Sequence, residues 1–178
     1  MSEGNEDILR GLLESILHIK ITKLTYLNLE KNNGNVYFRR KHFDFHVKTE
    51  TENIHIEVNG ELKEYTRIRN FAFICNTYSN SVLSGEEYDD ITKYIQINFN
   101  YGLSKNEEGL RIYKIMDEKQ NCFVNNLFIY EFNMAYYLHL WYSKNEKGIH
   151  DYKYLIMMDL KPKELEVLSK KDKVVNRY

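Results

Sequence analysis

The stretch FDFHVKTETENIHIEVN, residues 43–59, decides the fold of this chain. Polar and apolar residues alternate on both sides of segment 49–52, which is typical of two strands that each have one core face. A four-residue loop at 49–52 would pair positions whose numbers sum to 101, so that Phe45 lies opposite Ile56 and Asp44 opposite Glu57. A slip of one residue would pair polar with apolar side chains throughout. The stretch therefore predicts an antiparallel hairpin with two opposed carboxylates.

The two opposed carboxylates are the main candidates for chemistry. Their Cβ atoms would lie about 5 Å apart, where like charges repel. A hard divalent cation would offset that repulsion, so Asp44 and Glu57 are predicted to bind Mg²⁺ or Mn²⁺. Asn59, on the same face, is expected to orient water or phosphate as a third catalytic residue. Two alternatives remain open: an ordinary solvent-exposed hairpin face, and a transition-metal site that includes His46 and His55.

Periodicity along the rest of the chain predicts further helices and strands. Helices are expected at 6–18, 62–83, 134–141, 152–160 and 162–175, and strands at 21–29, 36–38, 94–99, 110–115 and 126–132. Pro162 is the only proline, and no Ser/Gly/Pro-rich stretch could serve as a linker. The pattern predicts one mixed α/β domain that spans residues 1–178.

Composition and charge limit the classes of function. The formal net charge of −1 gives no general attraction to polyanions, so any phosphate contact must be local, for instance at 39–41 or at Arg67 and Arg69. The polar start at 2–7 and the charges inside the first helix exclude a signal peptide or a membrane span there, and we expect a cytoplasmic protein. Cys75 and Cys122 have no partners at zinc-ligand spacing.

Several short motifs follow one another in a family-specific order. They are Phe43-Asp44-Phe45, Ile56-Glu57-Val58-Asn59, Arg69, the Gly85 to Tyr88 turn, the Tyr94 to Asn98 strand and the Ile129 to Met134 segment. In this order they resemble the recombination-promoting nucleases, also called PD-(D/E)XK nuclease family transposases. The resemblance implies a restriction-endonuclease-like core, a central mixed sheet flanked by helices. It also implies a Mg²⁺-dependent DNA endonuclease, a deoxyribonuclease tied to recombination or mobile elements.

Two departures from the family pattern bear on activity. The wider superfamily carries lysine where this chain has Asn59, and this family usually carries glutamine. The chain also looks shortened at both ends relative to the family. These departures keep a second hypothesis open: a non-catalytic interaction or regulatory protein that forms a homo-oligomer or pairs with a full-length family member. Auxiliary site residues are expected among Glu14 of the first helix, His46, His55 and Arg69.

Overall fold

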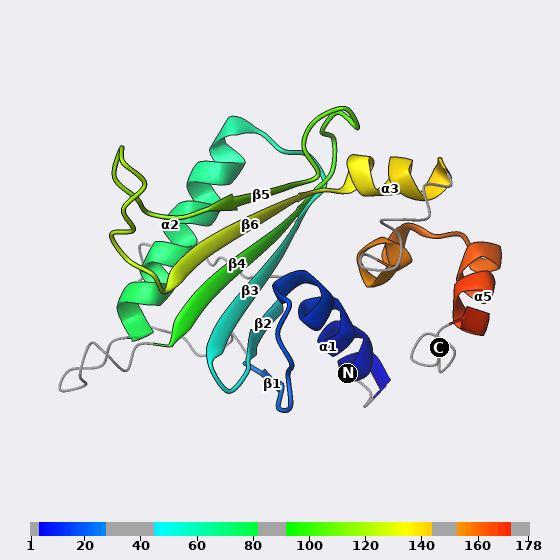
Figure 1. Ribbon diagram of the computed structural model, residues 1–178, viewed down its shortest axis with the longest axis horizontal. Coiled ribbons are helices and arrows are strands. Elements are labelled where there is room, and N and C mark those ends of the chain that lie inside the picture. Colours follow the sequence, from blue (N-terminus) through cyan, green and yellow to red (C-terminus); the bar gives the residue numbers. More distant parts are fainter. Residues whose placement is uncertain (1–3, 28–44, 82–91, 144–152, 172–178) are drawn as a thin grey trace, which may run out of the picture.

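The computed structural model describes residues 4–27, 45–81, 92–143 and 153–171, and its centre is a six-stranded sheet in the order β1-β2-β3-β4-β6-β5 (Figure 1). The strands are β1 (Thr25–Tyr26), β2 (Phe45–Lys48), β3 (Glu52–Asn59), β4 (Lys93–Asn100), β5 (Leu110–Tyr113) and β6 (Leu127–Asn133). β3, β4 and β6 run parallel, whereas β1, β2 and β5 pair antiparallel with their neighbours. The sheet is mixed, which confirms the predicted class.

The β2–β3 hairpin has the register that the alternation predicts. Phe45 pairs with Ile56, and the pairing continues to Lys48 opposite Asn53. The Thr49 amide closes the turn by donating to the carbonyl of Glu52 at 2.9 Å. The next pair in this register would be positions 44 and 57. Because Asp44 lies outside the described residues, its opposition to Glu57 stays a prediction.

Helices flank the sheet on both faces and lie beyond one end of its strands (Figure 1). They are α1 (Gly4–Leu17), α2 (Glu64–Ser81), α3 (Met134–Tyr142), the 3-10 turn η2 (Met157–Asp159) and α5 (Pro162–Lys171). Leu13 and Ile16 of α1 pack in one core with Ile54, Ile56 and Ile97 of the sheet, which is the function of the apolar stripe that the sequence shows. No helix in these described segments is both long enough and apolar enough to cross a bilayer.

α2 lies on the sheet face opposite α1 and forms the crossover between parallel strands β3 and β4. Parallel neighbours need such a long connection because a tight turn can only reverse the chain. Ile74 of α2 is fully buried against Tyr94 and Leu127. The helix predicted at 62–83 is therefore confirmed within the described residues, and it covers β3, β4 and β6.

Some expected elements differ from the structure. Of the strand expected at 21–29, residues 21–27 are described, and among them only Thr25–Tyr26 form a strand. Ile21 and Leu24 are buried in the core from irregular backbone instead, so burial alone produced the strand-like pattern. The helix expected at 152–160 is a helical turn at 153–156 followed by η2. The strand expected at 36–38 lies outside the described residues.

Gly109, just before β5, lies directly against the ring of Tyr136 in α3. A Cβ at this position would lie 2.3 Å from Tyr136 Cδ1, so we expect Gly109→Ala to lower the free energy of unfolding by about 1–3 kcal/mol through overpacking. Urea denaturation measures the change. Gly60→Ala is the matched control, because nothing lies within 4 Å of its Cβ position. Equal stabilities of the two variants would contradict the packing of α3 against the start of β5.

Candidate active site

The sheet face under α2 is polar, although it is buried. Two neighbouring rows run across β3, β4 and β6: Glu57, Asn98 and Glu131 in one, and Asn59, Asn100 and Asn133 in the other. Each of these residues is at most 8% exposed. A solvent-exposed face, one of the open alternatives, is therefore wrong for β3, because α2 covers it. Buried polar groups on this scale require hydrogen-bonding partners.

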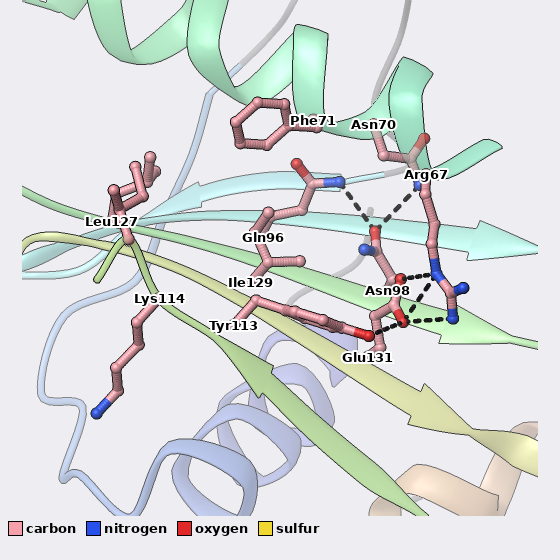
Figure 2. Close-up of a pocket in the computed structure, with 11 residues that line it drawn as sticks. Arg67, Asn70, Phe71, Gln96, Asn98, Tyr113, Lys114, Leu127, Ile129 and Glu131 are labelled. Carbon is pink, nitrogen blue, oxygen red and sulfur yellow. Dashed lines mark hydrogen bonds and ion pairs between the residues drawn. The ribbon is translucent and has the colours of Figure 1, made fainter. Parts of the chain in front are cut away.

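Polar side chains of α2 supply partners for the two central rows. Arg69 donates from Nη2 to Asn59 Oδ1 at 3.1 Å, and its guanidinium lies 3.8 Å from the Glu57 carboxylate. Asn70 donates from Nδ2 to Asn98 Oδ1 at 3.3 Å (Figure 2). Arg69 Nε also donates to Asn70 Oδ1 at 3.1 Å. One turn of α2 is thus tied to both β3 and β4.

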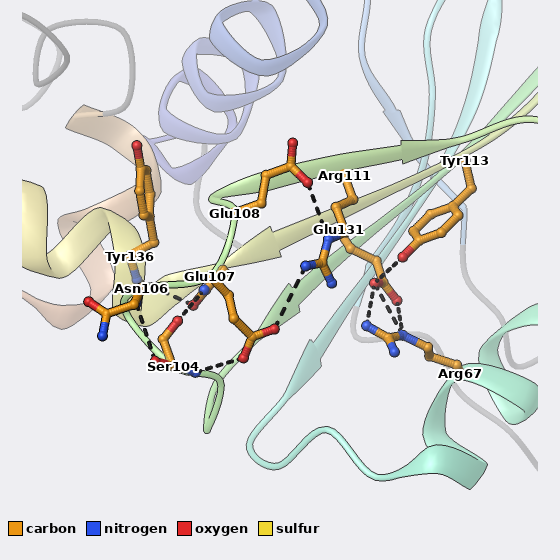
Figure 3. A network of polar contacts seen from close by, with 10 residues as sticks. Arg67, Ser104, Asn106, Glu107, Glu108, Arg111, Tyr113, Glu131 and Tyr136 are labelled. Carbon is orange, nitrogen blue, oxygen red and sulfur yellow. Dashed lines mark hydrogen bonds and ion pairs between the residues drawn. The ribbon is translucent and has the colours of Figure 1, made fainter.

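Glu131 of β6 is the second buried carboxylate of the row, and it is fully paired (Figure 3). Arg67 holds both of its oxygens, with Nε and Nη2 donating at 3.0–3.2 Å. The Tyr113 hydroxyl donates to Glu131 Oε2 at 3.2 Å. The bonds to Glu131 raise the pKa of Arg67 further, and burial raises the pKa of Tyr113. The arginine therefore stays charged and the phenol stays a donor at neutral pH.

The Glu57 carboxylate has a longer ion pair than Glu131: its guanidinium lies 3.8 Å away, whereas that of Arg67 lies 3.0 Å from Glu131. The Arg69 side chain is 44% exposed, whereas that of Glu57 is 11% exposed. Asn59 bridges the β-strands by donating from Nδ2 to Asn100 Oδ1 at 2.9 Å, while its own Oδ1 accepts from Arg69. The arrangement presents a carboxylate and a guanidinium side by side at the edge of a buried amide layer.

The histidines proposed as auxiliary residues lie on the same face, one row from Glu57. The rings of His46 and His55 stack with their centroids 3.8 Å apart. Burial lowers the pKa of His46 to about 4, and burial together with the neighbouring His46 lowers that of His55 to about 2. Both imidazoles are therefore neutral at pH 7. Within the described part of the chain, no three His, Cys, Asp or Glu residues form a group that could hold a metal ion.

Glu14 is not brought to this site. It belongs to α1, on the other face of the sheet, and its Oε1 accepts from the backbone amide of Ile21 at 2.8 Å. Of the auxiliary candidates, Arg69 is the one in contact with both Glu57 and Asn59. The geometry thus gives Glu14 a local role in the turn after α1.

Several residues of the polar layer were missed in the sequence. β4 reads Lys-Tyr-Ile-Gln-Ile-Asn-Phe-Asn, so Gln96, Asn98 and Asn100 alternate with apolar residues as clearly as those of β3. That alternation was the available signal. The pairing of Arg67 with Glu131 joins residues 64 positions apart, and no local pattern predicts it.

The mixed sheet with flanking helices and a carboxylate in a central strand is a restriction-endonuclease-like arrangement. The profile of the PD-(D/E)XK nuclease family transposases matches residues 1–177, and the chain belongs to this family. Searches of curated proteins and of solved structures gave no significant match. Membership of this family indicates a nuclease. The catalytic residues and the metal have to be inferred from the geometry around Glu57.

The two arginine pairs in Figure 3 differ in the burial of their partners. Arg67 pairs with Glu131, whose side chain is 7% exposed, whereas Arg111 pairs with exposed Glu107 and Glu108. We expect Arg67→Ala to cost about 2–3 kcal/mol of unfolding free energy, because a buried carboxylate loses its partner. Arg111→Ala should cost less than about 1 kcal/mol. Thermal or urea unfolding that shows equal losses would contradict the buried pair.

Proposed function

We propose that the protein is a divalent-metal-dependent DNA endonuclease whose reaction site is centred on Glu57. The observation that carries this proposal is the position of Glu57. Its carboxylate lies in a central strand, buried in the polar layer, within 3.8 Å of a cation that reaches solvent. The hairpin register adds Asp44 as its expected partner, and membership of a nuclease family supports DNA as the substrate.

The donor chemistry at Glu57 fits a hard cation. Mg²⁺ binds oxygen ligands and usually keeps several waters, so one or two carboxylates and the substrate phosphate are enough. Glu57 and Asp44 would be those carboxylates. A bound Mg²⁺ or Mn²⁺ would stabilise the negative charge that develops on the phosphate, and it would lower the pKa of the attacking water. His46 and His55, neutral at pH 7 because burial lowers the pKa of both, would not repel such a cation.

Arg69 supplies the fixed positive charge that the superfamily's lysine provides. Asn59 occupies the lysine position but is neutral and buried, and it accepts a hydrogen bond from Arg69. Asn59 itself is held by Asn100, so the two amides orient the guanidinium beside Glu57. A preorganised cation of this kind stabilises the charge that develops on the phosphate oxygens. Asn59 therefore acts through Arg69 in this mechanism.

Hydrolysis adds water across a phosphodiester and leaves one phosphate end and one hydroxyl end. In the setting of this family, the cut would serve recombination or the movement of a mobile element. The alternative, a non-catalytic regulatory member, is the result expected if the neutral Asn59 has removed the chemistry. Plasmid nicking by site variants separates the two functions.

Plasmid nicking in Mg²⁺ or Mn²⁺ tests the site directly. We expect Glu57→Gln and Asp44→Asn each to lower the nicking rate by at least about 100-fold, because loss of a metal ligand removes several kcal/mol of transition-state stabilisation. EDTA should abolish nicking by the natural sequence. Glu61→Gln is the matched control, because Glu61 is 71% exposed and pairs with Lys63, and its rate should be unchanged. Equal nicking by the Glu57 and Glu61 variants would refute the assignment.

Substitution of Arg69 separates charge stabilisation from metal binding. We expect Arg69→Ala to lower kcat by about 10²- to 10³-fold. Its Mn²⁺ affinity, measured by calorimetry, should be unchanged or tighter because a cation that competes for Glu57 is gone. The rate of Arg69→Lys should lie between those of the natural sequence and Arg69→Ala, since lysine keeps the charge but cannot donate to Asn59 and Asn70 with the guanidinium geometry. A variant with weaker Mn²⁺ binding and a normal rate at saturating metal would show that Arg69 only supports the fold.

A further inference from the structure

A cavity of about 230 Å³ lies between α2 and strands β4, β5 and β6 (Figure 2). It is far larger than the roughly 10–15 Å³ that one water requires and smaller than the roughly 300–1,000 Å³ of a site for a drug-sized ligand. Its size therefore suits a single ring system. The cavity also adjoins the proposed reaction site, because Asn98 in its lining pairs with Glu57 of the neighbouring strand.

Gln96 in the cavity lining provides an unused hydrogen-bond acceptor. The residue is fully buried, and its Nε2 donates to Asn98 Oδ1 at 2.9 Å. Because Asn98 Oδ1 also accepts from Asn70, the orientation of the Gln96 amide is fixed. Gln96 Oε1 has no partner among the described residues, and Figure 2 shows it directed toward Phe71. A buried carbonyl without a hydrogen-bond partner favours an occupant that brings an N–H donor.

The walls of the cavity are suited to a flat ring. Phe71 of α2 and Tyr113 of β5 line it from two sides (Figure 2), and both are partly exposed, at 48% and 43%. Leu127 and Ile129 add apolar surface from β6. Aromatic side chains in such positions stack unpaired bases, and the stacking tolerates any base. Selectivity among planar rings would then come from the Gln96 acceptor.

Charge around the cavity suits a ring that carries phosphate. Arg67 and Lys114 both line it, and the bonds of Arg67 to Glu131 raise its pKa, so it remains a cation. The Glu131 carboxylate is already saturated by Arg67 and Tyr113. The features open to an occupant are therefore one acceptor, two aromatic faces and the charge of Lys114, which together match a nucleotide.

We propose that this cavity receives a nucleobase with an exocyclic amino group, adenine or cytosine, from an unpaired nucleotide of the DNA substrate. The amino group donates to Gln96 Oε1 while the ring lies against Phe71. This inference rests on the proposed function, because it takes DNA as the substrate. A base must leave the duplex stack to enter such a cavity. The cavity would thus select the nucleotide next to the cleaved bond and favour unpaired or distorted sites.

The test is a binding measurement without metal, so that it does not depend on cleavage. Fluorescence anisotropy in EDTA, with the Glu57→Gln protein, compares two labelled thymidine oligonucleotides. One carries a central adenine, and the other carries purine, which lacks only the amino group. We expect adenine to bind about fivefold or more tightly, as one hydrogen bond to a buried acceptor implies. Equal affinities, or no binding of either strand, would overturn the inference.

Matched variants on α2 and β4 complete the test. Phe71→Ala should weaken adenine binding by about tenfold through lost stacking, whereas Ile68→Ala, at a 65% exposed position one turn away and outside the cavity lining, should not. Gln96→Leu should bind adenine and purine equally. Equal losses in the Phe71 and Ile68 variants would overturn the inference. If the protein binds adenine more tightly than purine but never nicks plasmid, the base site is supported and only the endonuclease function is rejected.

Discussion

The structure depends on the burial of two carboxylates in one row of the sheet, each beside an arginine from the same helix. Glu57 of β3 lies beside Arg69, and Glu131 of β6 is held by Arg67. A buried charge without a partner is strongly unfavourable, so α2 cannot slide or rotate without cost. Residues two apart on a helix point in different directions. The two arginines therefore reach different strands, while Asn70, which follows Arg69, reaches β4.

The same constraint gives the two halves of the polar layer different roles. Around Glu131 every charge is satisfied, and this half supports the fold and one wall of the cavity. Around Glu57 the ion pair with Arg69 is longer, at 3.8 Å, than the 3.0 Å pair of Arg67 and Glu131. In the proposed nuclease, the Glu131 half would keep the Glu57 half in place, because positioning of charge provides most of the catalysis.

The sequence predicted the fold where the physics is local. The hairpin register followed from alternation, because a slip would expose the core face, and the described pairs from Phe45 to Lys48 confirm it. The burial of the polar face was not predicted, since it depends on α2 lying across strands that are distant in sequence. The partner of Glu131 was missed for the same reason. The role of Asp44 came from register and family resemblance, and it stays a prediction.

The central claim is that Glu57 and Asp44 together hold the catalytic metal, and anomalous diffraction from crystals soaked in Mn²⁺ tests it most directly. The expected result is a manganese peak about 2.0–2.2 Å from carboxylate oxygens of both residues, with Arg69 still bonded to Asn59. A peak held by other residues would contradict the account. So would the absence of any peak while Glu57 stays beside Arg69, because the arginine would then be the only cation at this site.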